Sequence, residues 1–191
     1  MYNSKHIANL TAAAMFVALI TLAGALSIPV PPSPSPVNFV DMFVILAGLM
    51  LGWKWGLATV ITYIILGAIG VPVFSNMTGG WGILLTVRGG FIFSFIPVVV
   101  VAGILRPRTN TTRPYMATAI TAAIAYIIVF ACGMFFARYL ATPNFPSWPV
   151  TFNYMLWPFL PGTMLKFGLI LLLSTGGEKS TINMIRMQLD K

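Results

Sequence analysis

The stretch that decides the fold is residues 39–70, FVDMFVILAGLMLGWKWGLATVITYIILGAIG. It consists of two apolar runs on either side of Trp53-Lys54-Trp55, and its only other charged residue is Asp41 near the start. A helix surrounded by lipid and protein is apolar on all sides, so run length and helix-breaking residues divide this chain better than periodicity does. The stretch therefore predicts two short membrane helices, at residues 39–52 and 56–70.

The remainder of the chain has the same composition. Of 191 residues, 58% are hydrophobic and only 7% are charged, which is too apolar for a soluble domain of this size. A soluble core needs a polar covering, and eleven Lys and Arg with three Asp and Glu cannot provide one. The net charge of +8 is spread between hydrophobic runs and forms no single basic face, which argues against a nucleic-acid partner. We predict an all-α integral membrane protein.

Six apolar segments are expected to form one transmembrane domain over residues 1–191. The second and third are short for a hydrocarbon core of about 30 Å, which fits helices that end against protein or a cavity. Alternating spans place three Pro-rich or Gly-rich loops, at residues 29–36, 71–82 and 142–149, on one side of the membrane. The six predicted spans are residues 9–28, 39–52, 56–70, 83–105, 115–140 and 155–174.

The distribution of positive charge predicts the orientation. The three long loops hold no Lys or Arg, whereas the opposite side holds most of the basic residues. Because Lys and Arg accumulate in cytoplasmic loops, both termini are expected in the cytoplasm and the three loops outside the cell. The basic residues on the predicted cytoplasmic side are Lys5, Lys54, Arg106, Arg108, Arg113, Lys179, Arg186 and Lys191.

No motif for catalysis, a metal or a cofactor is found. Cys132 is the only cysteine and lies in an apolar run, so neither a disulfide nor a cysteine metal site is expected. A Ser/His/Asp set and an HExxH motif are absent, and residues 176–181, GGEKST, lack the Gly-Lys junction and the upstream glycine of a P-loop. We expect no enzyme, and any energy for transport has to come from a partner or a gradient.

Four ionisable residues lie within or at the ends of predicted spans: Asp41, Arg88, Arg138 and Lys166. A charge in a span costs at least about 2.5 kcal/mol on insertion scales, so it usually faces the interior and has a partner or a function. All four are expected in the external half. If they share a cavity, its formal charge is about +2, which selects an anionic ligand. The alternatives are that Arg138 reaches the lipid headgroups and that Asp41 pairs with a Lys or Arg.

Further polar and aromatic side chains near the external side could complete such a site. They supply hydrogen bonds and an aromatic wall, although Trp and Tyr near span ends are more often interface anchors. In the first span, Ala14 and Ala18 form a small-xxx-small pair on one helical face, which would let another helix approach closely. The additional candidates for the ligand site are Asn38, Tyr63, Asn76, Trp81, Asn153 and Thr163.

Several ordered motifs resemble the BioY family, the biotin-binding S components of bacterial energy-coupling factor (ECF) transporters. The likeness covers most of the chain. The motifs are Ala14-Met15-Phe16-Val17-Ala18, Pro36-Val37-Asn38-Phe39, residues 46–56 (LAGLMLGWKWG), residues 63–75 (YIILGAIGVPVFS), Gly89-Gly90-Phe91 and residues 157–166 (WPFLPGTMLK).

The resemblance implies a six-helix S component in the bacterial cell membrane, with a ligand site near the outer face under loops that act as a lid. It also implies a transmembrane T component and two cytoplasmic ATPases as partners, so ATP would be used by those subunits and not by this chain. The alanine motif of the family contacts the T component, which implies that role for Ala14 and Ala18. The family's lysine contacts ligand, which implies that role for Lys166.

The chain departs from the family pattern at three places. Thr163 stands where the family usually has Asp, Val40 where it usually has Gln, and Thr86-Val87-Arg88 where it usually has Gly-Pro-Thr. Arg88 can add a bidentate contact to a carboxylate. We therefore expect an S component that captures biotin or a related small carboxylate such as lipoate. The alternative is a stand-alone oligomeric carrier or channel for a small organic anion.

Overall fold

The computed structural model describes residues 4–28, 37–107, 114–141, 145 and 147–176. Within these ranges the secondary structure is helical, apart from two isolated bridges, Ile28–Val37 and Phe74–Thr78. Five helices are long and apolar enough to cross a membrane, which confirms the predicted all-α membrane protein. The elements are α1 (Ser4–Ala25), α2 (Val40–Ala68), α3 (Trp81–Leu84), α4 (Val87–Ile104), α5 (Pro114–Phe136), η1 (Ala137–Ala141), α6 (Trp148–Met155), η2 (Trp157–Phe159) and α7 (Leu160–Gly176).

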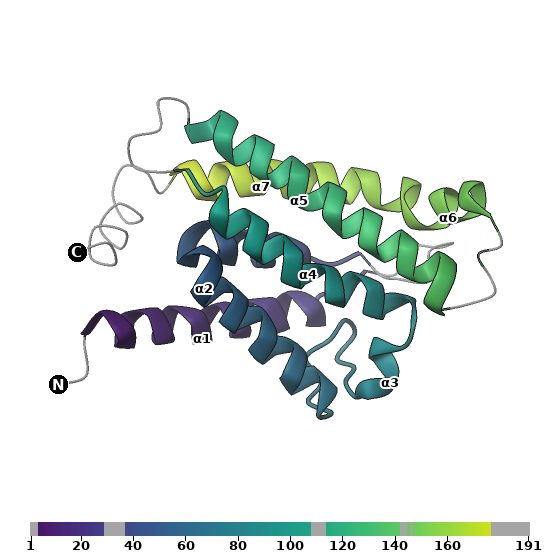
Figure 1. Cartoon of the computed structure of the whole chain (residues 1–191), viewed down its shortest axis with the longest axis horizontal. Helices are drawn as coiled ribbons and strands as arrows, with labels where there is room; N and C mark the ends of the chain where they lie inside the picture. Colours follow the sequence, from purple (N-terminus) through teal and green to yellow (C-terminus); the bar gives the residue numbers. More distant parts are fainter. Residues whose placement is uncertain (1–3, 29–36, 108–113, 142–144, 146, 177–191) are drawn as a thin grey trace.

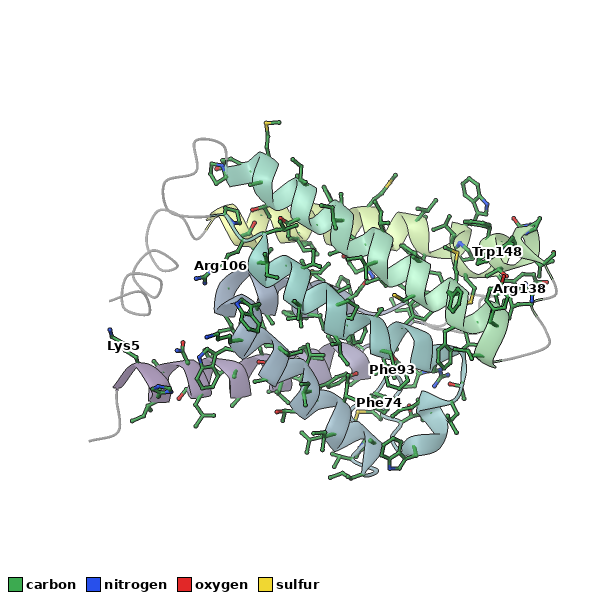
Figure 2. All side chains as sticks on the ribbon, in the orientation of Figure 1. Lys5, Phe74, Phe93, Arg106, Arg138 and Trp148 are labelled. Atoms are coloured by element: carbon green, nitrogen blue, oxygen red, sulfur yellow. The ribbon has the colours of Figure 1, made fainter. Side chains whose placement is uncertain are left out.

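The long helices pack in chain order, with α1 against α2, α2 against α4, α4 against α5 and α5 against α7 (Figure 1). Helix α7 also contacts α2, which closes the bundle around its interior. The start of α1 and the end of α7 lie at the same end of the bundle (Figure 1). Lys5 and Arg106 lie at that end, whereas Arg138 and Trp148 lie at the opposite end (Figure 2).

Helix α2 is two helical segments joined by a sharp bend at Gly52. This residue has φ 76° and ψ 175°, a conformation that glycine adopts without steric cost. The predicted spans 39–52 and 56–70 correspond to the two halves of α2, which are continuous through the bend. Helix α4 comes very close to the bend, because a Cβ on Gly103 would lie only 2.2 Å from the backbone nitrogen of Trp53. Small residues therefore hold the bend against α4.

The structure differs from the predicted spans at two connections between helices. Helix α3 precedes α4, so the helix expected from residue 83 begins at Val87. Helix α6 begins at Trp148 in a segment expected to be a loop, and α7 begins at Leu160 instead of residue 155. Pro149 was counted in the predicted loop, and Pro158 lies inside the predicted span 155–174, but both stand in the first turn of a helix, where the missing N–H has no intrahelical partner to lose. The Pro-rich loop at 29–36 and residues 142–144 lie outside the described residues.

Candidate ligand-binding site

A cavity inside the bundle is lined by side chains from α2, α3, α4, α5, η2 and α7, from the segment that joins α2 to α3, and by Asn38 just before α2. Most of its wall is aliphatic and aromatic, with a few polar and charged groups. Small-molecule sites in proteins have this composition. The lining residues are Asn38, Val40, Asp41, Tyr63, Phe74, Ser75, Ile83, Arg88, Phe91, Ile92, Phe95, Val129, Phe130, Phe159 and Lys166.

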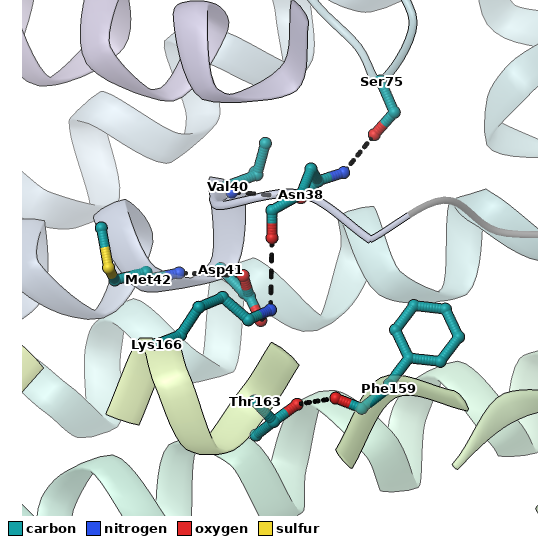
Figure 3. Close-up of polar contacts among 8 residues, drawn as sticks. All are labelled: Asn38, Val40, Asp41, Met42, Ser75, Phe159, Thr163 and Lys166. Carbon is teal, nitrogen blue, oxygen red and sulfur yellow. Dashed lines mark hydrogen bonds and ion pairs between the residues drawn. The ribbon is translucent and has the colours of Figure 1, made fainter. Parts of the chain in front are cut away.

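A buried ion pair forms one side of the cavity (Figure 3). The Nζ atom of Lys166 lies 2.5 Å from Oδ2 of Asp41, and it also donates to the carbonyl oxygen of Asn38 at 3.2 Å. The backbone N–H of Met42 donates to the other Asp41 oxygen at 3.0 Å. Lys166 is 4% exposed and Asp41 9%, so each charge depends on the other for neutralisation. The sequence left open whether Asp41 pairs structurally, and the structure shows that it does.

Asn38 connects three parts of the site. Its Nδ2 donates to Oγ of Ser75 at 2.6 Å, and its Oδ1 accepts from the backbone N–H of Val40 at 3.1 Å (Figure 3). Its carbonyl oxygen is the one that accepts from Lys166. One residue therefore joins the segment between α2 and α3, the first turn of α2 and the ammonium on α7.

Arg88 faces the same cavity from the first turn of α4. It is half-buried, and within the described ranges its guanidinium makes no hydrogen bond or ion pair. Two cations and one carboxylate line the cavity, which gives it a formal charge of +1. Because Asp41 already neutralises Lys166, the unmatched charge is that of Arg88. A ligand with an anionic group would complement it best.

Four of the residues proposed from the sequence are not part of the cavity wall. Asn76 is exposed, with φ 60°, and its N–H donates to the carbonyl of Gly24 at 3.1 Å. Trp81 is 68% exposed at the start of α3. The hydroxyl of Thr163 donates to the carbonyl of Phe159 on the preceding turn (Figure 3). Asn153 is also exposed.

Arg138 is likewise absent from the cavity wall, which lowers the expected cavity charge of about +2 to +1. It lies in η1, at the end of α5 that is opposite Lys5 and Arg106 (Figure 2). The cavity charge therefore comes from three of the four ionisable residues found in the spans.

The sequence did not identify most of the aromatic wall of the cavity. Phe91 and Phe95 are one turn apart on α4 and both face the ligand space, and Phe159 stacks on Phe91 with 6.1 Å between ring centroids. Phe130 meets Phe159 edge-on at 6.3 Å. The spacing of Phe91 and Phe95 indicates that they share one face of a helix. Many other phenylalanines lie in equally apolar runs, so this spacing did not single them out as cavity residues.

The fold and the site define a multi-pass membrane protein with an interior cavity suited to a small molecule that carries an anionic group. Similarity to known proteins supports the same class. The sequence model of the BioY family matches residues 1–182, and the chain belongs to this family. The matching relatives are named as transporters and not as enzymes, in agreement with the absence of a catalytic motif.

Two curated relatives and one solved structure show how far the likeness extends. The biotin transporter BioY of Thermotoga maritima is 36% identical over 127 residues, 66% of this chain and 72% of the relative. The biotin transporter BioY of Rhodobacter capsulatus is 30% identical over 171 residues, 83% and 86% of the two chains. A crystal structure described as the S-component for biotin from an ECF-type ABC transporter superposes with a TM-score of 0.82, covers 97% of this chain and 98% of its own, and is 23% identical. This last likeness concerns the fold.

Proposed function

We propose that this chain is the membrane-embedded substrate-binding subunit of an ECF-type vitamin importer and that it captures biotin or a related small carboxylate from outside the cell. Membership of the BioY family and the names of its relatives support the substrate class. The observation that carries the proposal is the half-buried guanidinium of Arg88, which faces an aromatic-walled cavity without a partner in the described chain. A ligand carboxylate supplies the missing acceptor.

The other polar groups that line the cavity favour biotin over lipoate. The ureido ring of biotin has N–H donors, and a buried donor left unpaired costs about 1–3 kcal/mol. The carboxylate of Asp41 and the hydroxyl of Ser75 line the cavity and can accept such bonds. Thr163, where the family usually has Asp, bonds the carbonyl of Phe159 at the end of η2, so Asp41 takes the acceptor role in this proposal. Lipoate offers no N–H to these groups.

Ligand titration of the purified protein tests the proposed substrate. Biotin is expected to bind more tightly than lipoate, and biotin methyl ester about tenfold or more weakly than biotin, because the ester removes the charge that Arg88 contacts. Isothermal titration in detergent measures all three affinities. Equal affinities for biotin and its methyl ester would contradict the role of Arg88, and no binding of any of the three would contradict the proposed substrate class.

The exposed alanines of α1 support a partner subunit in the membrane. Ala14 and Ala18 are one turn apart and both are exposed, so they offer a flat face to another helix. We assign this face to the T component of the importer, which would act with two ATPase subunits that use ATP. The orientation that fits has both termini in the cytoplasm, because Lys5 and Arg106 lie at the same end of the bundle (Figure 2).

Replacing Ala14 and Ala18 by Trp is expected to abolish most biotin uptake by cells while leaving the affinity of the purified protein unchanged. The added rings prevent close approach of a partner helix, but they point away from the cavity. Radiolabelled uptake and titration measure the two properties. Ala123→Trp, at an exposed alanine of α5, is the matched control and should transport normally. Loss of binding in the α1 variant would show a different role for this helix.

A further inference from the structure

A second, open groove lies between α4 and α5 on the outer surface of the bundle. It is apolar, and the exposed rings of Phe93 and Phe135 form its sides. Its one hydroxyl, on Ser94, already donates to the carbonyl of Phe91 at 2.6 Å. The groove therefore offers no polar group to a ligand and fits a hydrocarbon chain. The lining residues are Gly90, Phe93, Ser94, Ala131, Cys132, Phe135 and Phe136.

An aromatic series continues from this groove to a cation. Phe135 lies 4.9 Å from Tyr139 between ring centroids, and Tyr139 lies 6.0 Å from Trp148. The guanidinium carbon of Arg138 is 5.1 Å from the Tyr139 centroid. The Nε atom of Arg138 is buried and has no hydrogen-bond partner in the described part of the chain. Arg138 and Trp148 lie together at one end of the bundle (Figure 2). Such amphipathic rings are typical of the headgroup level of a membrane.

The chain has few carboxylates that could neutralise Arg138. It contains three acidic residues, of which Asp41 is bonded to Lys166 inside the cavity. The other two, Glu178 and Asp190, follow α7 in the sequence and lie outside the described residues. No acid therefore stands near Arg138 within the described ranges, where an anion from outside the chain can supply the partner.

We propose that this surface holds an anionic phospholipid, with its phosphate on Arg138 and an acyl chain in the groove between α4 and α5. An unpaired guanidinium joined to an apolar groove matches the two parts of such a lipid. A free phosphate ion would leave the groove unused, so the commitment is to the lipid. The site is separate from the cavity that contains Arg88 and does not depend on what that cavity binds.

Native mass spectrometry of the delipidated protein tests this site. The probes are dioleoyl phosphatidylglycerol and dioleoyl phosphatidylcholine, added at equal concentrations. The wild type should retain phosphatidylglycerol about fivefold more than phosphatidylcholine. In Arg138→Gln this preference should disappear, and in Ala131→Trp, which fills the groove, retention of both lipids should fall. Lys54→Gln is the matched control, because Lys54 also lies over an aromatic ring, 5.5 Å from Trp53, but does not line this groove.

The control separates a built site from general attraction of lipid to positive charge. Loss of the preference in Arg138→Gln with its retention in Lys54→Gln would support the site. An unchanged preference in Arg138→Gln, or equal losses in both variants, would overturn the proposal. Unchanged retention of both lipids in Ala131→Trp would also overturn it, because the groove would then contribute nothing.

Discussion

Arg88→Ala is expected to lower the affinity for biotin by about 10- to 150-fold, the equivalent of the roughly 1.5–3 kcal/mol that a hydrogen bond to a charged group contributes. The effect is large because no other cation in the cavity is free to replace it, since Asp41 already neutralises Lys166. Arg88→Lys should retain part of the affinity, because a lysine keeps the charge but not the bidentate geometry. Titration of the purified variants gives the affinities.

Two controls identify what Arg88 contacts. Arg138→Ala removes a cation that does not line the cavity and should leave the affinity for biotin unchanged. In Arg88→Ala, biotin and its methyl ester should bind equally, because the group that distinguishes them is gone. If the variant still prefers biotin over the ester by the wild-type factor, the carboxylate is bound elsewhere and the assignment of Arg88 is wrong.

Lys166→Met is expected to destabilise the protein by about 3–5 kcal/mol, because it leaves the buried carboxylate of Asp41 without its counter-charge. The double variant Lys166→Met, Asp41→Asn should regain most of this stability, since an uncharged pair of similar size avoids the desolvation penalty. Neither variant should bind biotin with wild-type affinity. Denaturant or thermal unfolding in detergent measures the stabilities, and titration measures the binding.

Comparing the unfolding stabilities of the single and double variants shows whether loss of the ion pair with Asp41 accounts for the destabilisation by Lys166→Met. A double variant no more stable than the single one would mean that Lys166 stabilises α7 through contacts other than Asp41. One candidate is the ring of Tyr126, whose centroid lies 5.7 Å from the Lys166 Nζ atom. Tyr126→Leu in the wild-type background would measure that contribution separately.

Charge was the part of the site that could be predicted from the sequence. Ionisable residues are costly in a membrane span, so Asp41, Arg88 and Lys166 stood out against an apolar background, and all three line the cavity. The same reasoning left Arg138 with two possibilities, the cavity or the lipid headgroups, because the cost of insertion does not say which way a side chain points. The bend at Gly52 was indicated by two short runs around Lys54.

The uncharged part of the site could not be predicted in the same way. Asn76, Trp81 and Thr163 were chosen for their chemistry, but their positions depend on the path of a loop or on a bond to the preceding turn. The phenylalanines of the wall look like those that face lipid, since both kinds lie in fully apolar runs. Ser75 lies in a turn whose position depends on its contact with Asn38.

The three bonds made by Asn38 have a consequence for how a solute would be admitted. Its side chain donates a hydrogen bond to Ser75, beside Phe74, while its backbone carbonyl accepts one from the ammonium of Lys166. Displacement of that segment at Ser75 would break the first bond and leave Asn38 held by its bonds to Val40 and Lys166. A movement of this segment that admits a solute would therefore remove one of the three bonds that position the acceptor of the Lys166 ammonium.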